Sequence, residues 1–229
     1  MIGIAPNRVC RTLAWVTGWC AICAGPGCSV GTGEGAVTSE RLFVDGCWLG
    51  TFDLQPNFFA ANPYDNTLTI RVQRGERDIR ESDGITMLVN DVAGIRGGGL
   101  LGQELPLGLP VGVSPIGYGL PDVPNPPAAS LNLYLHNSCR GQNAELFAVD
   151  GYVNFEKLFS GDLNEDNADD RLTKGTFVAY VVDPRDAVPR SSTDADAGPA
   201  YTYPADRTSR VDGEFNFVFH RGTPAQPFP

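Results

Sequence analysis

One acidic segment, GDLNEDNADDR at residues 161–171, carries the side chains best suited to chemistry. Three oxygen-bearing side chains stand at alternate positions and two more follow, so they could converge on one Ca²⁺ ion from a single curved loop. The candidate calcium ligands are Asp162, Asn164, Asp166, Asp169 and Asp170. The segment therefore raises calcium binding as a hypothesis.

The acidic segment is similar to the beginning of an EF-hand or dockerin loop, D-x-[DN]-x-[DN]-G, and departs from it at two positions. Asn167 replaces the glycine of the sharp turn, and Thr173 stands where the bidentate glutamate belongs. These departures favour a solvated acidic turn in which Asp and Asn side chains bond to nearby backbone amides. A weak calcium site is the alternative.

Signals for catalysis are scarce. His136 and His220 are the only histidines, and both fall at outward positions of expected strands. Neither G-x-S-x-G nor H-E-x-x-H occurs in the sequence. The glycine-rich segments 31–36 and 97–102 do not join a strand to a helix, as a phosphate-binding loop would. We expect no enzymatic activity, and the alternative is a hydrolase that pairs two of the 27 acidic side chains.

The N-terminus has the pattern of an export signal. Arg8 and Arg11 precede an apolar run at residues 13–25, and small residues follow it. The run has about 13 residues, whereas a membrane-spanning helix needs about 20. We therefore expect residues 1–27 to be removed and the rest of the chain to fold outside the cytoplasm.

Gly27 and Cys28 resemble the cleavage site of bacterial lipoproteins, where a small residue precedes the cysteine that receives the lipid, although Gly25 and Pro26 depart from that pattern. The resemblance implies a lipid on Cys28, hence a membrane partner. Because Ser29 is not aspartate, it also implies sorting to the outer membrane. The alternative is cleavage by the ordinary signal peptidase, which would give a secreted protein.

Only two cysteines, Cys47 and Cys139, remain once the signal is removed and Cys28 is acylated. An even remainder outside the reducing cytoplasm indicates a disulfide between them. Each of the two also ends an expected strand.

Composition excludes one class of partner. The chain has 229 residues, with 17 Lys and Arg against 27 Asp and Glu, a net charge of −10. Nucleic acid is not expected to bind, because phosphate recognition needs a basic face. After the signal and a flexible tether at residues 28–40, the length fits a single domain at 41–229.

Alternating hydrophobicity dominates that domain. It is clearest at residues 67–74, 130–136 and 211–221, the last of which places Phe215 and its alternate neighbours Phe217 and Phe219 on one face. Further strand candidates are residues 41–47, 51–54, 84–91, 147–155 and 176–183. Such stripes are typical of half-buried antiparallel strands. Eight short strands separated by Gly, Pro and Asp turns predict an all-β, antiparallel β-sandwich.

Two long loops interrupt the strands. Residues 97–127 are rich in Gly and Pro but apolar, and we expect an extended flap over the sheet or one of its edges. Residues 190–198 are small and acidic, and we expect disorder there.

The last 80 or so residues contain a G-x-V-x-F-x-x-L strand, an F-S-G-D-x-N-E turn, D-R-L-T, D-P-R and a closing P-A-Q-P-F-P. In these motifs the chain resembles a group of secreted or lipid-anchored β-rich envelope proteins of Gram-negative bacteria. The resemblance implies an envelope location and supplies no active site.

We therefore expect an exported, lipid-anchored envelope protein that acts as a structural or binding module. One alternative is a domain that binds a cell-surface glycan or peptide through exposed aromatic side chains, with Trp48, Tyr118, Tyr201 and Tyr203 as candidates. The other alternative is an envelope hydrolase with paired carboxylates in a deep pocket.

Overall fold

The computed structural model describes residues 28–75, 78–110, 127–142, 144–189 and 201–225. The predicted export signal at 1–27 lies outside these residues, as do the central part of the expected flap at 111–126 and the acidic segment 190–198. No described helix is long and apolar enough to cross a membrane.

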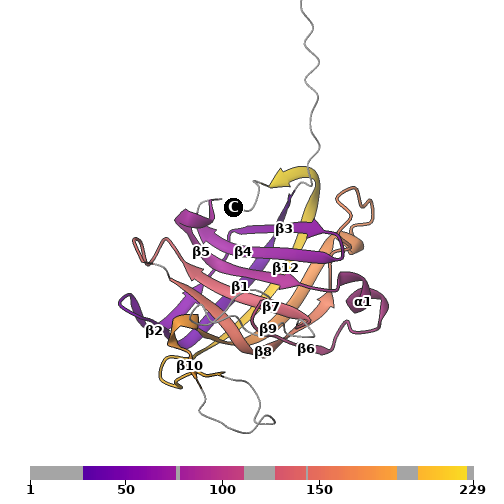
Figure 1. The fold of residues 1–229 in the computed structure, drawn as a ribbon. Helices are drawn as coiled ribbons and strands as arrows, with labels where there is room; N and C mark the ends of the chain where they lie inside the picture. Colours follow the sequence, from indigo (N-terminus) through magenta and orange to yellow (C-terminus); the bar gives the residue numbers. More distant parts are fainter. Residues whose placement is uncertain (1–27, 76–77, 111–126, 143, 190–200, 226–229) are drawn as a thin grey trace, which may run out of the picture.

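Eight antiparallel strands form one sheet that closes on itself (Figure 1). They are β1 (Cys28–Val44), β3 (Phe58–Tyr64), β4 (Thr67–Gly75), β5 (Ser82–Val89), β7 (Ala129–Leu135), β8 (Glu145–Lys157), β9 (Leu172–Val182) and β12 (Ser209–Ala225). Their order is β12-β9-β8-β7-β5-β4-β3-β1, and β1 pairs again with β12. The all-β, antiparallel prediction is confirmed, but the closed sheet is a barrel and not the expected sandwich.

Shorter strands and helical turns lie outside the eight strands of the barrel. Two further strands, β2 (Trp48–Leu54) and β6 (Glu104–Pro106), pair with β1 and β8, and β10 (Val188–Pro189) pairs with β11 (Tyr201–Thr202) in a separate hairpin. In the part of the chain that the structure describes, the helical elements are α1 (Val92–Gly97) and the 3-10 turns η1 (Ile79–Glu81), η3 (Asp169–Arg171) and η4 (Pro184–Asp186).

The barrel interior is one hydrophobic cluster to which all eight strands contribute. On β12, Phe215, Phe217 and Phe219 alternate inward and are 2%, 1% and 1% exposed. The Phe217 ring stacks on Phe59 of β3, with ring centroids 5.0 Å apart. The predicted inward stripe near the C-terminus is therefore confirmed. Side chains that fill an eight-stranded barrel leave the ends and the outer wall for binding.

The prediction of a flexible tether at residues 28–40 is wrong, because these residues form most of β1. The first half of β1 pairs with β12 from Cys28 to Thr38, and residues 29–31 also pair with β3. This half-strand closes the barrel. An open sandwich was expected because the closing strand was missing from the predicted set.

Glycines in β1 explain why it was missed. Gly31, Gly33 and Gly35 lie opposite Phe219, Phe217 and Phe215 in the β1–β12 register. A Cβ atom built on Gly33 would lie 2.4 Å from the Cβ of Phe217 and 2.2 Å from the carbonyl oxygen of Asn216. The small residues thus make room for the large rings of the neighbouring strand, and the Gly-rich sequence is a packing feature.

Candidate functional site

The predicted disulfide between Cys47 and Cys139 is present. Cys47 lies in the turn between β1 and β2, and Cys139 lies in the turn between β7 and β8. Their Cα atoms are 5.8 Å apart across a sequence separation of 92 residues. The bond therefore ties together two turns that are distant in sequence.

Hydrogen bonds fix the same two turns. The Gln142 side-chain Nε2 donates to the carbonyl oxygen of Gly46 at 3.0 Å, which links the β7–β8 turn to the β1–β2 turn. The Asp83 carboxylate accepts from the backbone N–H groups of Asn137 and Ser138, both at 3.0 Å, and from the Ser138 hydroxyl at 2.6 Å. Hydrogen bonds therefore hold the β7–β8 turn to the β1–β2 turn on one side and to β5 on the other.

A cavity of about 430 Å³ lies beside these turns. Three of the described segments line it: the end of β1 with the first residue of the β1–β2 turn, the β7–β8 turn with the start of β8, and η4 with the residue before it. The lining residues are Val44, Asp45, Gln142, Leu146, Asp183, Arg185 and Asp186. The volume is within the range of small-molecule sites.

Asp183 is fixed by the segment that follows β9. In the sequence Asp-Pro-Arg, the Asp183 side chain caps η4 by accepting from the Arg185 backbone N–H at 2.9 Å, and Pro184 supplies the first helical position. The Arg185 Nε donates to both carboxylate oxygens at 2.9 Å. Burial raises the pKa of Asp183, but the hydrogen bonds from Arg185 outweigh it and lower the pKa below its ordinary value.

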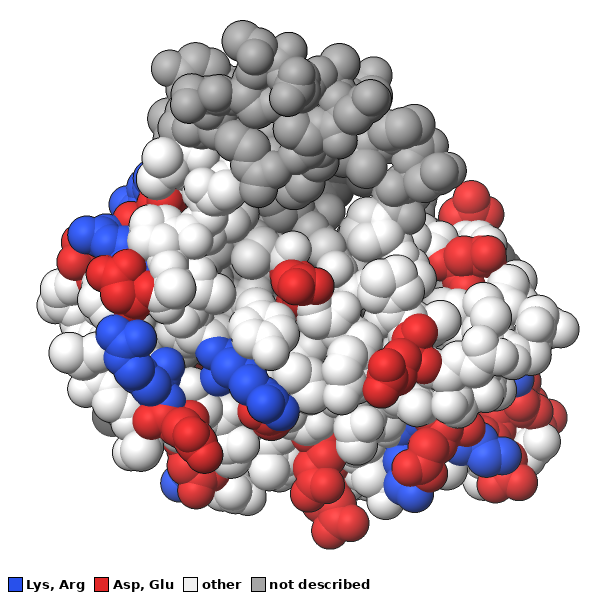
Figure 2. Space-filling model, turned by 90° about the horizontal axis from the view of Figure 1, so that it is seen from below, with Lys and Arg blue, Asp and Glu red and all other residues white. Residues whose placement is uncertain are grey.

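The other two cavity carboxylates differ in their partners. Asp186 accepts from Arg207 Nη1 at 2.6 Å, and the Arg207 guanidinium also lies over the Phe43 ring at 5.7 Å. Asp45 is exposed and makes no hydrogen bond or ion pair with the described residues, although its charge acts on Arg185 and Arg207. Figure 2 views the molecule from the side of β10, where acidic and basic side chains lie next to one another.

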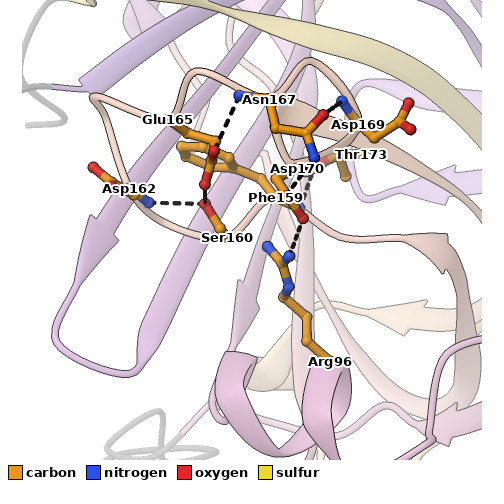
Figure 3. Close-up of polar contacts among 9 residues, drawn as sticks. All are labelled: Arg96, Phe159, Ser160, Asp162, Glu165, Asn167, Asp169, Asp170 and Thr173. Atoms are coloured by element: carbon orange, nitrogen blue, oxygen red, sulfur yellow. Dashed lines mark hydrogen bonds and ion pairs between the residues drawn. The ribbon is translucent and has the colours of Figure 1, made fainter.

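The acidic segment forms a loop whose side chains bond to its own backbone (Figure 3). The Asp162 carboxylate accepts from the Asn164 N–H at 2.9 Å, and the Ser160 hydroxyl accepts from the Asp162 N–H at 3.2 Å. The Glu165 carboxylate accepts from the Asn167 N–H at 3.0 Å. This is the arrangement expected for an acidic turn.

The C-terminal half of the loop is tied to the barrel (Figure 3). The Asp170 carboxylate bonds to Arg96 of α1 and accepts from the Asn167 side-chain amide at 2.8 Å. Asn167 in turn accepts from the Asp169 N–H at 3.1 Å. Thr173 is buried in β9 and its hydroxyl accepts from the Phe159 N–H at 3.1 Å, so it does not supply a closing ligand.

The five candidate calcium ligands are therefore neighbours along one loop, with Asp162 and Asp170 turned to different partners. Among the described residues, no three or more His, Cys, Asp or Glu side chains are grouped to hold a metal ion. Calcium binding by the loop stays a prediction.

His136 is half-buried in the turn after β7, whereas His220 is exposed on β12. His136 Nδ1 lies 2.9 Å from the Ile79 carbonyl oxygen, and its Nε2 lies 3.2 Å from the Glu145 carboxylate. His220 Nε2 lies 2.9 Å from the Thr32 hydroxyl. These contacts join neighbouring segments and do not place a histidine in the cavity lining.

The candidate aromatic residues do not form one described surface. The Trp48 ring packs edge-on against Phe52 at 5.8 Å, and Tyr203 is half-buried. Tyr201 belongs to β11, and Tyr118 lies outside the described residues. Sequence reasoning overlooked a different pair, Tyr152 and Tyr180, at outward positions of β8 and β9.

Cys28, the predicted lipidation site, is the first residue of β1 and pairs with Ala225. Its lipidation stays a prediction. The cavity residues Asp45, Asp183 and Arg185 were also missed by sequence reasoning. The one local signal was the Asp-Pro-Arg cap, because an aspartate followed by proline at the end of a strand is typical of a helical N-terminus.

Comparison of the chain with known proteins found no matching family model, no similar curated protein and no similar solved structure.

Proposed function

We propose that the chain is an exported, lipid-anchored protein of the cell envelope that acts as a binding module, with its ligand site in the cavity beside the disulfide. The observation that carries the proposal is the position of the Cys47–Cys139 bond, which joins the turns on two sides of the cavity. Disulfides persist outside the reducing cytoplasm, which supports export. A cross-link between two walls keeps a site preorganised, which supports binding.

Binding is favoured over hydrolysis by the state of the carboxylates. A glycosidase pair needs one carboxyl group with a raised pKa that donates a proton. Asp183 has the opposite character, because Arg185 holds its pKa below the ordinary value. Asp186 is paired with Arg207. We therefore propose a non-enzymatic role for the cavity.

Glycan binding is a second candidate, and the outer wall of β8 and β9 favours it. Tyr180 is 38% exposed, and Tyr152 lies diagonally across from it because Tyr152 pairs with Val178. Arg210 pairs with Tyr180 from the β12 side and forms an ion pair with Asp212 at 2.7 Å. Exposed tyrosines beside a charged pair combine an apolar face with hydrogen-bonding groups. Affinity electrophoresis in polysaccharide gels, with Tyr180→Ala as the variant, tests this candidate.

The principal proposal is tested by expressing the full chain in a Gram-negative bacterium with radiolabelled palmitate. The expected result is a labelled protein in the membrane fraction, an unlabelled Cys28→Ser variant, and no free thiol at Cys47 or Cys139. A labelled Cys47→Ser/Cys139→Ser variant is the matched control. Wild-type protein that remains in the cytoplasm with free thiols would refute export.

Binding is tested on the same purified protein by NMR. Methyl signals of Val44 and Leu146 and the side-chain amide of Gln142 report on the cavity. A panel of amines, neutral sugars and uncharged peptides is titrated, and at least one class is expected to shift these signals. If every class leaves them unchanged, the cavity is not a ligand site.

A further inference from the structure

The ligand class follows from the charges of the cavity. Its described lining has three carboxylates and one guanidinium. Two of the carboxylates are neutralised in pairs, Asp183 by Arg185 and Asp186 by Arg207. Asp45 is left as the carboxylate with no hydrogen bond or ion pair to the described residues. The described residues of the site therefore carry one negative charge beyond these ion pairs, in a chain of net charge −10.

We propose that the cavity binds an organic cation, the ammonium group of a lysine-like side chain or other primary amine, through the Asp45 carboxylate. This inference rests on the proposed function of the cavity as a ligand site. A charge-assisted hydrogen bond from the ammonium to Asp45 supplies the polar contact. The net negative charge of the chain attracts a cationic ligand and speeds its association.

The rest of the described lining adds one polar acceptor above an apolar floor. Val44 and Leu146 are core side chains that are 5% and 3% exposed, so they close the floor of the cavity and leave its accessible surface mainly polar. The Gln142 Nε2 donates to the Gly46 carbonyl oxygen, so the side-chain oxygen of Gln142 can serve as a second acceptor for the ligand.

Two other ligand classes fit less well. An anion would have to compete with Asp183 and Asp186 for guanidinium groups that these carboxylates already hold. A divalent metal ion needs several hard ligands around it, and the described residues offer no group of three. A single carboxylate with no hydrogen bond or ion pair to the described residues matches a compact, singly charged organic cation.

The probe is acetyl-lysine amide, and acetyl-norleucine amide is the uncharged control with a similar stem. Both are titrated into the purified, disulfide-bonded protein while the methyl signals of Val44 and Leu146 are recorded by NMR. We expect saturable shifts with the lysine probe and none with the norleucine probe. Added salt should weaken the lysine complex, because the contact is electrostatic.

Asp45→Asn is the decisive variant, and Glu34→Gln is the matched control, since Glu34 is an exposed carboxylate on β1, the strand that leads to Asp45, and lies outside the cavity. We expect Asp45→Asn to weaken binding of the lysine probe about tenfold, the loss of one charge-assisted contact, and Glu34→Gln to leave it unchanged. Asp45 is exposed and holds no described partner, so its variant should melt at the wild-type temperature.

Equal shifts with the two probes, or an Asp45→Asn protein that binds like wild type, would overturn the assignment of an organic cation. If a neutral sugar or peptide shifts the same signals while the lysine probe does not, the cation proposal fails and the binding module stands. If nothing in the panel shifts them, both proposals fail together.

Discussion

Replacing Gly33 by alanine should destabilise the barrel because β1 and β12 approach each other too closely for a side chain. A Cβ atom at Gly33 would lie 2.2 Å from the Asn216 carbonyl oxygen and 2.4 and 2.5 Å from the Cβ and Cα atoms of Phe217. Cβ atoms in real proteins essentially never come within 3.0 Å of such neighbours, so the strands must separate by at least 0.8 Å. Such overpacking costs about 1–3 kcal/mol, and occasionally more.

The kind of atom that lies close to Gly33 places the expected cost in the upper part of that range. All three belong to the backbone or to a Cβ atom, which cannot rotate away. We expect Gly33→Ala to lower the free energy of unfolding by about 3 kcal/mol, or the melting temperature by about 6–12 °C for a domain of this size. For the same reason, shortening the opposite ring with Phe217→Leu should not rescue the variant.

Two controls on the same strand separate this clash from a general effect of substitution. At Gly31 the nearest atom is 3.0 Å away and the next is a side-chain atom of Phe219 at 3.3 Å, so Gly31→Ala should cost less than about 1 kcal/mol. Glu34→Ala, on the exposed face, should stay within about 0.5 kcal/mol of wild type. Urea unfolding of the oxidised proteins, followed by tryptophan fluorescence, gives the three values. Equal stability of Gly33→Ala and Gly31→Ala would refute the β1–β12 register.

Three further outcomes follow from the structure. Phe217→Ala should cost about 3–5 kcal/mol in the same urea assay, because the ring is 1% exposed, and a loss below 1 kcal/mol would contradict its place in the core. The calcium hypothesis predicts a Ca²⁺-dependent rise in melting temperature that both Asp162→Ala and Asp166→Ala abolish, and no rise at millimolar Ca²⁺ leaves only the acidic turn. The pKa of Asp183 is lowered from its ordinary 3.8, so its pairing should stabilise the fold above that pH and be lost as pH falls through the lower value of the folded state. Thermal melts should therefore show Asp183→Asn destabilised at neutral pH, with its difference from wild type shrinking as the pH falls below 3.8; a difference that does not change with pH would contradict this.

The strands that sequence analysis predicted are those whose own side chains form the inward stripe. Residues 67–74, 130–136 and 211–221 correspond to β4, β7 and β12. The first half of β1 gave no such signal, because its inward positions are glycines and the partner strand supplies the apolar volume. A pattern of hydrophobicity within one strand cannot reveal packing that depends on its neighbour. Barrel closure was missed for this reason.

The same difference between local signals and long-range contacts applies to the candidate site. The disulfide was predicted because counting cysteines requires no knowledge of the fold. The cavity was not predicted, because it joins Asp45, Gln142 and Asp183, which come from three segments far apart in sequence. The acidic segment was locally conspicuous, but its side chains bond mainly to their own loop and to Arg96. Local spacing predicted the turn, whereas the site depends on long-range contacts.

The strand β1 connects the two parts of the proposed function. It begins at Cys28, the residue proposed to carry the lipid, and ends at Val44, which lines the cavity three residues before the disulfide-bonded Cys47. At about 3.3 Å per residue, a strand of 17 residues extends for up to about 56 Å. A lipid on Cys28 would therefore hold the start of β1 at the membrane surface and direct the cavity away from the bilayer. Since β1 is paired along its length, this orientation would be set by the barrel itself.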